Sequence, residues 1–320
     1  MRLSTAILPV HPWREARALW RRAEELGAHA AYVFDHLAWR EFRDGPWYGT
    51  VPTLAAAATA TSRLRLGTMV ASPTFRHPVT LARELMTLDD MSGGRLTVGI
   101  GAGGAGFDTT VLGEEPWTPA ERADRFAEFL PLLDRLLTAS STTHRGTYYS
   151  AVEAPNRPGC VQRPRPPFTV AATGPRGLRL AARYGQGWAT FGDRRRAAGQ
   201  SGDAVLADVR AQLGRLARAC AEEGRDPGEL GRTYLTGFTQ DPWLSSVDAF
   251  VDLAGRYAEA GIGEVVLPWP LPGTLYAADQ RVFEDILTEA PAQLAPRSPD
   301  GPSGASLSSP PRRTSAAPSP

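Results

Sequence analysis

Short apolar runs alternate with helix-length amphipathic segments along most of this chain, and this alternation is the feature that most restricts its fold. Residues 13–27, for example, carry apolar side chains at the spacing of one helix face and end at a glycine, as many helices do. Strands that alternate with helices in this way predict a parallel sheet. The expected strands are residues 3–8, 30–34, 64–71, 96–100, 168–172, 188–191, 234–238 and 265–267.

Eight such repeats without a break in composition favour an α/β fold closed into a (β/α)8 TIM barrel over an open sheet. The 320 residues fit one barrel with additions, and we expect the barrel to occupy residues 1–290. Residues 138–167, rich in Pro, Gly, Tyr and Thr, predict an insertion between the fourth helix and the fifth strand, as a hairpin or excursion over the barrel mouth. Residues 291–320 have few large apolar side chains and predict a disordered C-terminal tail.

The charge balance argues against two classes of partner. With 35 basic and 34 acidic side chains, the chain has no cationic excess to neutralise nucleic acid or an anionic membrane surface. Its two cysteines, Cys160 and Cys220, suggest neither a metal site nor a disulfide framework. The N-terminus meets Pro9 too early for a signal peptide or membrane span, so we expect a cytoplasmic protein. The expected partner is a small-molecule substrate, and a homodimer is one assembly the chain could form.

In a barrel of this kind, functional groups lie on the loops that follow the carboxyl ends of the strands. Asp35 and His36 follow the second expected strand, and Trp39 comes shortly after them. His36 is the candidate proton donor or acceptor, because imidazole is the usual group for moving a proton near neutral pH. Its neighbour Asp35 is expected to orient or charge the imidazole. The same pair could equally be an aspartate that caps a turn beside a surface histidine.

The fourth expected strand runs into the glycines of residues 99–104, which match the Gly-x-Gly-x-x-Gly dinucleotide fingerprint in form. That fingerprint needs a helix to begin within the glycines, whereas the next expected helix begins at Thr118, a capping residue followed by Pro119. The segment therefore predicts a mouth loop with few side chains, which lets a flat ring system approach the backbone.

The fifth expected strand is followed by residues 173–177, where small residues lead directly into a helix. A helix N-terminus with small residues around it is a backbone anion site, which Arg176 could reinforce. An ordinary Gly-Pro helix start would have the same sequence.

Three stretches resemble the bacterial luciferase-like superfamily: GAHAAYVFDH at residues 27–36, the run from TSRLRLGTMVASPTFRHP to SGGRLTVGIGAGG at residues 61–104, and AATGPRGLRLAARYGQGW at residues 171–188. The similarity extends from about residue 2 to residue 290. Within the superfamily, the motifs after the second, third and fifth strands are most similar to the branch that uses the deazaflavin coenzyme F420. FMN is the alternative cofactor, because FMN-using monooxygenases share the scaffold.

The resemblance implies a set of cofactor contacts at the barrel mouth. These contacts are Asp35 and Ser72 at the deazaflavin, Met69 and Val70 in a non-prolyl cis peptide behind its ring, Ala102 and Gly103 along the ring or side chain, and Thr173, Gly174, Pro175, Arg176 and Gly177 at its phosphate.

Three departures limit what the resemblance implies. The F420-dependent sugar-phosphate dehydrogenases have a glutamate where this chain has Gly104, so their acid-base partner is missing. The chain contains no lysine to hold a sugar phosphate, so that substrate is not expected. Gln186 replaces the aspartate of the Tyr-Gly-Asp-Gly-Trp motif, a change that the sequence does not explain.

The leading hypothesis is an oxidoreductase in which F420 exchanges hydride with a small, largely apolar organic substrate while His36 supplies or accepts the proton. One alternative is an FMN-dependent monooxygenase that uses reduced flavin and O2 in a dry pocket. Another is a non-catalytic flavin-binding protein, against which the intact Asp35 and His36 argue. The side chains expected to wall the pocket are Trp39, Phe75, Phe107 and Trp269.

Overall fold

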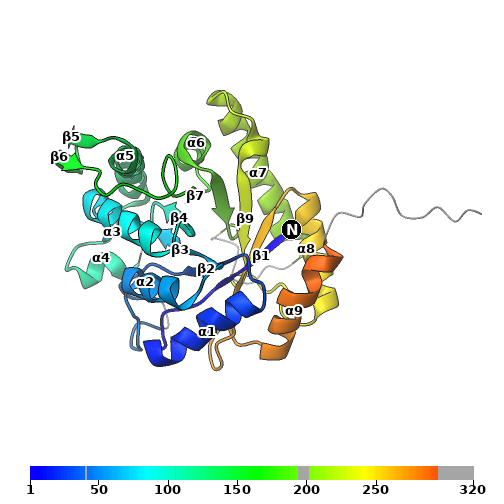
Figure 1. Cartoon of the computed structure of the whole chain (residues 1–320). Helices are drawn as coiled ribbons and strands as arrows, with labels where there is room; N and C mark the ends of the chain where they lie inside the picture. Colours follow the sequence, from blue (N-terminus) through cyan, green and yellow to red (C-terminus); the bar gives the residue numbers. More distant parts are fainter. Residues whose placement is uncertain (40–41, 105, 194–201, 295–320) are drawn as a thin grey trace, which may run out of the picture.

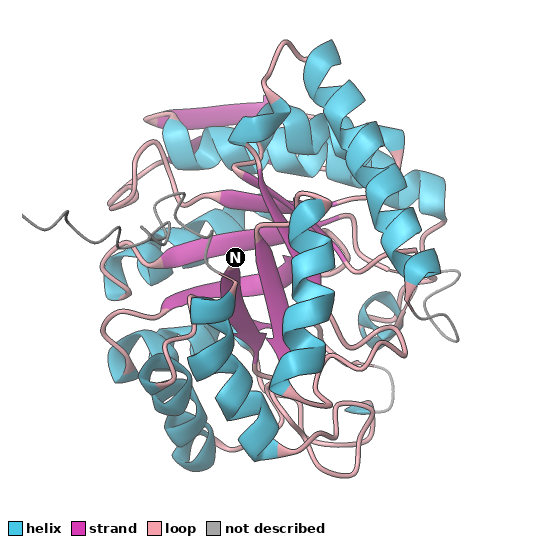
Figure 2. Cartoon of the chain, turned by 90° about the vertical axis from the view of Figure 1, so that its right-hand side faces the viewer, coloured by secondary structure: helices cyan, strands magenta, loops and turns pink. Residues whose placement is uncertain are grey.

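The computed structural model describes residues 1–39, 42–104, 106–193 and 202–294. Within these residues, eight parallel strands close into a barrel in the order β1-β10-β9-β8-β7-β4-β3-β2. Helices surround the barrel (Figure 1 and Figure 2), so the predicted (β/α)8 fold is confirmed. The barrel strands are β1 (Arg2–Ala6), β2 (Ala30–Val33), β3 (Arg65–Ala71), β4 (Leu96–Gly101), β7 (Phe168–Ala171), β8 (Gly187–Thr190), β9 (Gly231–Leu235) and β10 (Glu264–Pro268).

The helices follow the strands as the periodicity predicts, with some differences at their ends. Thr118 caps helix α5, as predicted, and its hydroxyl accepts a hydrogen bond from the Glu121 N–H at 3.2 Å. The helices are α1 (Trp13–Glu25), α2 (Thr50–Ala60), α3 (Pro78–Met91), α4 (Phe107–Val111), α5 (Pro119–Thr138), α6 (Pro175–Tyr184), α7 (Asp203–Glu222), α8 (Val247–Glu259) and α9 (Gln280–Gln293), with a 3-10 turn, η2 (Pro227–Glu229), before β9.

The structure differs from the prediction most in three places. The short helix α4 occupies part of the mouth loop that was expected to be irregular, and β9 ends at Leu235, three residues before the predicted end at Phe238. Helix α9 continues past Pro291, where a tail was expected, because Ile286, Leu287 and Ala290 on the same helix are buried. The remainder of the expected tail, residues 295–320, lies outside the described residues.

The predicted hairpin is present as β5 (Ser141–Arg145) and β6 (Ser150–Pro155), an antiparallel pair outside the barrel sheet. The Glu128 carboxylate on α5 accepts hydrogen bonds from three successive N–H groups of its turn, those of residues 147–149. Tyr149 packs edge-on against Phe129 of α5 and against His77 at the start of α3. The hairpin therefore covers the outside of these helices (Figure 1) and not the barrel mouth.

A buried carboxylate fills the barrel interior at the amino ends of the strands. Glu264 is 4% exposed, and its Oε1 accepts hydrogen bonds from Ser4 Oγ at 2.7 Å and Tyr32 Oη at 3.0 Å. Burial and the neighbouring carboxylate raise the pKa of Tyr32 well above its usual value, so the phenol stays a donor. Because satisfied polar groups fill this end of the barrel interior, we expect a ligand site within the barrel to lie at the opposite end.

Glu24, near the end of α1, fastens this helix to the segment that precedes β3. Its carboxylate accepts hydrogen bonds from the backbone N–H groups of Ser62 at 2.8 Å, Arg63 at 2.7 Å and Leu64 at 2.8 Å. Burial alone would raise the pKa of Glu24, but these hydrogen bonds outweigh it and lower the pKa to about 2.

Glu24→Gln is expected to lower the free energy of unfolding by about 1 to 2 kcal/mol at neutral pH, because it weakens charge-assisted hydrogen bonds that solvent partly screens. The unfolded chain, with an ordinary pKa of 4.5, binds more protons than the folded chain as the pH falls toward 2. The contribution of Glu24 is therefore complete above pH 4.5 and is lost on acidification below it. Urea unfolding of both proteins between neutral pH and about pH 3 measures the effect.

The control is Glu25→Gln, which removes an exposed carboxylate one residue along the same helix and should change stability by less than about 0.5 kcal/mol. A difference between wild type and Glu24→Gln that does not shrink on acidification would contradict the role assigned to the Glu24 carboxylate.

Candidate active site

The carboxyl ends of β2, β3, β4 and β7 lie side by side, because these strands are neighbours in the closed barrel. The residues predicted from sequence follow these four strands, so the barrel brings all of them to one mouth. They are Asp35 and His36 after β2, Met69 and Val70 within the end of β3 and Ser72 after it, Ala102 and Gly103 after β4, and Thr173, Gly174, Pro175, Arg176 and Gly177 after β7.

Apolar and aromatic side chains line the mouth end of the barrel. A buried cluster that includes Phe34, Met69 and Tyr276 lies inside the barrel, with partly buried Trp39 packed against it. Two aromatic pairs extend it, with ring centroids 6.3 Å apart for Phe42 and Tyr276 and 4.8 Å for Phe191 and Phe238. These side chains give the mouth end of the barrel a largely apolar lining. The other partly buried side chains packed against this cluster are Val10, Phe42, Trp47, Val70, Ala171, Phe191, Phe238 and Leu271.

The predicted pocket wall is correct only in part. Trp39 packs against the apolar cluster that contains Phe34. Trp269 instead belongs to the larger hydrophobic core, where its ring centroid lies 4.9 Å from that of Phe283 on α9. Phe75 and Phe107 lie under arginine side chains, those of Arg76 and Arg43 respectively. The aromatic residues that the sequence analysis missed lie in irregular loops, where no periodic pattern indicates which way a side chain points.

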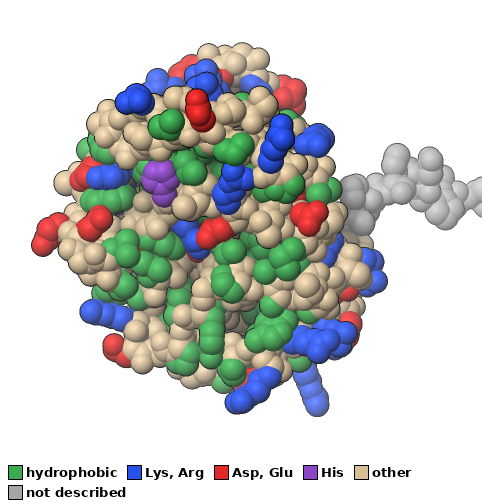
Figure 3. Space-filling model, turned by 60° about the vertical axis from the view of Figure 1, so that its left-hand side comes forward, with side chains coloured by type: hydrophobic (Ala, Val, Ile, Leu, Met, Phe, Trp, Pro, Cys, Tyr) green, Lys and Arg blue, Asp and Glu red, His purple; other side chains and the backbone are tan. Residues whose placement is uncertain are grey.

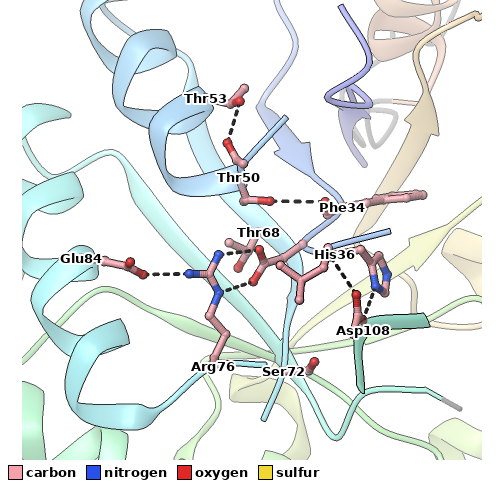
Figure 4. Close-up of polar contacts among 12 residues, drawn as sticks. Phe34, His36, Thr50, Thr53, Thr68, Ser72, Arg76, Glu84 and Asp108 are labelled. Atoms are coloured by element: carbon pink, nitrogen blue, oxygen red, sulfur yellow. Dashed lines mark hydrogen bonds and ion pairs between the residues drawn. The ribbon is translucent and has the colours of Figure 1, made fainter. Parts of the chain in front are cut away.

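His36 is held at the mouth from three sides. Its Nδ1 lies 2.8 Å from Oδ2 of Asp108 on α4 (Figure 4). Its ring stacks on Trp39, with the ring centroids 4.3 Å apart. The Trp47 indole N–H donates to the His36 carbonyl at 2.8 Å. The other Asp108 oxygen accepts the Leu37 N–H at 2.7 Å. The prediction that Asp35 orients His36 is therefore wrong, since the carboxylate at His36 comes from α4.

Asp35 is instead the partner of Arg76, which comes from the loop after β3. Its side chain is 1% exposed, and its two oxygens accept hydrogen bonds from Arg76 Nη2 at 2.7 Å and Nε at 3.1 Å. Arg76 also binds Glu84 of α3 at 3.0 Å (Figure 4). Burial would lower the pKa of Arg76, but the Asp35 carboxylate outweighs it and raises that pKa. The pair joins the loops that follow two neighbouring strands.

The backbone at the ends of β3 and β4 packs closely around small residues. The Met69–Val70 peptide is cis, which confirms that prediction. Gly103 has φ +77°, and a Cβ there would lie 2.6 Å from Cγ2 of Thr74 and 3.1 Å from Oγ of Ser72. The hydroxyls of Ser72 and Thr74 lie 2.5 Å apart, so one donates to the other. Glycine is therefore required for the loop after β4 to approach the loop after β3.

The loop after β7 forms an uncapped helix N-terminus. No side chain caps α6 at Gly174, and a Cβ at this position would meet nothing within 4 Å. The Trp188 indole N–H donates to the Ala172 carbonyl at 2.7 Å, which anchors the loop. Arg176 forms an ion pair with Asp124 of α5, at a place where both side chains are 44% exposed. The open N-terminus fits an anion bound by backbone N–H groups.

Gln186 has a structural explanation that the sequence did not offer. Its Oε1 accepts hydrogen bonds from Arg165 Nη1 at 2.9 Å and from the Phe168 N–H at 3.0 Å. Arg165 is 5% exposed, and Asp134 also binds it, at 2.7 Å. The amide therefore satisfies a buried guanidinium beside the start of β7, away from the mouth.

Outside the mouth, the described residues form a surface pocket, and the charges on one face of the molecule are mixed. A surface pocket of about 610 Å³ lies between α5 and the hairpin, lined in part by Glu128, His144 and Tyr148. The described part of the chain holds no group of three or more metal-ligating side chains and no helix that could span a membrane. Figure 3 shows acidic and basic side chains interspersed among apolar ones on the face in view.

The fold and the site define a class of protein: a TIM barrel with a histidine–carboxylate pair beside an apolar mouth and an open helix N-terminus that suits a phosphate-bearing ligand. The chain belongs to the luciferase-like monooxygenase family, whose model matches residues 1–239. The match agrees with the superfamily resemblance found in the sequence.

Individual relatives fall into two kinds. The chain is 40% identical over 171 residues to an F420-dependent glucose-6-phosphate dehydrogenase from Beutenbergia cavernae, a match that covers 52% of this chain and 49% of that protein. It is 33% identical over 261 residues to 4-hydroxyprotoasukamycin monooxygenase from Streptomyces nodosus subsp. asukaensis, covering 78% of this chain and 67% of that one. The chain thus spans about half the length of the dehydrogenase.

Among solved structures, the barrel resembles an F420-dependent secondary alcohol dehydrogenase in complex with an F420–acetone adduct. The TM-score is 0.73 at 19% sequence identity, and the match covers 92% of this chain and 100% of that one. At this identity the likeness confirms the fold alone.

Asp35→Ala is expected to lower the free energy of unfolding by about 3 to 5 kcal/mol, because it leaves the largely buried Arg76 without its principal counter-charge. Adding Arg76→Met to that variant should recover part of the loss, since it removes the uncompensated charge. Urea unfolding of the two single variants and the double variant gives the coupling energy. Asp44→Ala, which removes an exposed carboxylate from the same loop, is the control. Additive losses would show that the pair does not stabilise the mouth.

Proposed function

We propose that this protein is an oxidoreductase that uses coenzyme F420 to exchange hydride with a small, largely apolar organic substrate, while His36 gives or takes the accompanying proton. The observation that carries the proposal is the placement of His36. Its Nδ1 is bound to Asp108, its side chain is 20% exposed, and no described residue forms a hydrogen bond with its Nε2. One imidazole nitrogen is therefore free to exchange a proton at the mouth.

The residues at the mouth fit a deazaflavin that carries a phosphate. Val70, Ser72, Ala102 and Gly103 offer small or backbone surfaces on the adjacent ends of β3 and β4, where a flat ring could lie. Residues 173–177 offer the open N-terminus of α6 for the phosphate, with Arg176 nearby. Both carboxylate oxygens of Asp35 bind Arg76, so we propose that Asp35 positions the loops around the coenzyme and does not contact it directly. When bound, the coenzyme supplies the hydride chemistry.

The surroundings of His36 favour an uncharged substrate. Trp39 and Phe42, together with the aromatic pair Phe191–Phe238, form an apolar lining that excludes water and provides few partners for a charged group. Although several relatives are glucose-6-phosphate dehydrogenases, this chain has no lysine, and it has Gly104 at the position where the resemblance implies a glutamate in such dehydrogenases. We therefore propose an alcohol or carbonyl compound of low polarity as substrate, and not a sugar phosphate.

An FMN-dependent monooxygenase is the second candidate. It is favoured by the monooxygenase relative, whose match extends over 78% of this chain, further than that of the dehydrogenase. Both candidates place an isoalloxazine-like ring at the same mouth, so the choice depends on which coenzyme the protein binds.

We expect the purified protein to bind F420 at least about tenfold more tightly than FMN, a difference of about 1.4 kcal/mol. Fluorescence titration of the full chain with each coenzyme measures both dissociation constants. A Gly174→Asp variant places a carboxylate in the open space at the start of α6 and should weaken binding of either coenzyme through repulsion of its phosphate. Equal affinities, or a preference for FMN, would favour the monooxygenase instead.

His36→Ala should lower turnover by about 10² to 10⁴-fold and leave coenzyme affinity close to that of the wild type, because it removes the proton-transfer group. Steady-state rates with an activated enone or a reactive aldehyde, together with coenzyme titration, provide the comparison. His144→Ala, on the hairpin outside the barrel, should retain the wild-type rate. If folded His36→Ala turns over at the parental rate, another group transfers the proton.

A further inference from the structure

We propose that Asp108 is a positioning residue that keeps neutral His36 protonated on Nδ1, so that Nε2 is the nitrogen that exchanges the proton with substrate. The catalytic consequence rests on the proposed function, whereas the assignment of the tautomer rests on geometry alone.

The hydrogen bonds around Asp108 determine which nitrogen carries the proton. An ionised carboxylate accepts hydrogen bonds and cannot donate them. Oδ2 of Asp108 lies 2.8 Å from Nδ1 of His36, so Nδ1 must be the donor in that contact. Oδ1 accepts the Leu37 N–H at 2.7 Å, which prevents the carboxylate from turning away. The Asp108 residue is only 6% exposed, so water competes little for these bonds.

The neighbours of His36 fix the direction of its free nitrogen. Trp39 stacks on the imidazole at an interplanar angle of 25°, which defines the plane of the ring. Trp47 holds the carbonyl of the same residue at 2.8 Å, which limits movement of its backbone. With the plane fixed and Nδ1 bound, Nε2 can point in only one direction, and no described residue hydrogen-bonds to it there.

Asp108 reaches His36 from a different strand end. It lies on α4 in the loop after β4, four residues beyond Gly104, which has no side chain to offer. His36 lies in the loop after β2, and the hydrogen bond spans 72 positions in the sequence. The two loops are thus joined by one carboxylate that binds both the imidazole and the backbone of the neighbouring residue.

The discriminating variant is Asp108→Asn, which keeps the shape and inverts the hydrogen-bonding pattern. The Leu37 N–H requires an oxygen opposite it, so the asparagine must turn its oxygen toward Leu37 and its NH2 group toward His36. Nδ1 would then accept a hydrogen bond, and the proton would move to Nε2. If Asp108 acted only through the Leu37 N–H, the tautomer of His36 would stay the same.

The first measurement is the ¹⁵N NMR spectrum of the full-length protein labelled in histidine, at a pH where imidazole is neutral. The His36 signals are assigned by their absence in His36→Gln. We expect protonated Nδ1 in the wild type and protonated Nε2 in Asp108→Asn, with the other histidine signals unchanged. Protonated Nε2 in the wild type, or the same tautomer in both proteins, would overturn the proposal.

The second measurement is steady-state turnover. Asp108→Asn should lower kcat by about 10²-fold, the scale of one general acid or base, with KM and coenzyme affinity close to those of the wild type. Glu115→Gln, which removes an exposed carboxylate from the loop after α4, should match the wild type in both experiments. An unchanged kcat in Asp108→Asn, when His36→Ala is impaired, would overturn the role of Asp108. An unimpaired His36→Ala would instead refute proton transfer by His36 and leave the tautomer assignment to the NMR result.

Discussion

The candidate site depends on the buried ion pair between Asp35 and Arg76. Two charged groups are removed from water at the junction of β2 and β3, and the hydrogen bonds on both carboxylate oxygens compensate for their desolvation. Asp35 is covalently followed by His36, and Arg76 follows the Ser72–Thr74 turn within the same loop. The pair therefore sets the positions of the backbone segments that carry the imidazole and the Ser72 hydroxyl.

Carboxylates bind different partners inside the barrel, on its outside and at its mouth. At the closed end, Glu264 is surrounded by hydroxyl donors and fills the interior. On the outside, Glu24 and Glu128 each bind three successive backbone N–H groups and hold connecting segments in place. At the mouth, Asp108 binds one backbone N–H and one imidazole, so it alone of these carboxylates among the described residues contacts a candidate catalytic group.

This chain shares backbone features of the mouth with its family but differs from it in individual side chains. The barrel, the cis peptide and the glycines at the end of β4 agree with the family pattern, because they shape the backbone around the mouth. The departures concern individual side chains. Gln186 binds a buried arginine away from the mouth, whereas Gly104 has no side chain at the mouth, where Asp108 is the carboxylate bound to His36.

The sequence by itself determined the alternation of strands and helices, the closed barrel, the hairpin and the strand ends at which the candidate site residues lie. These features follow from periodicity and turn residues within short segments, and the resemblance added the cis peptide. Only the tertiary structure decided which side chains meet. Asp35 precedes His36 directly, yet it binds Arg76, 41 positions away, while His36 binds Asp108, 72 positions away. Adjacent residues at a strand end point in different directions, so neighbours in sequence need not share a partner, and closure of the barrel determines which loops come within hydrogen-bonding distance.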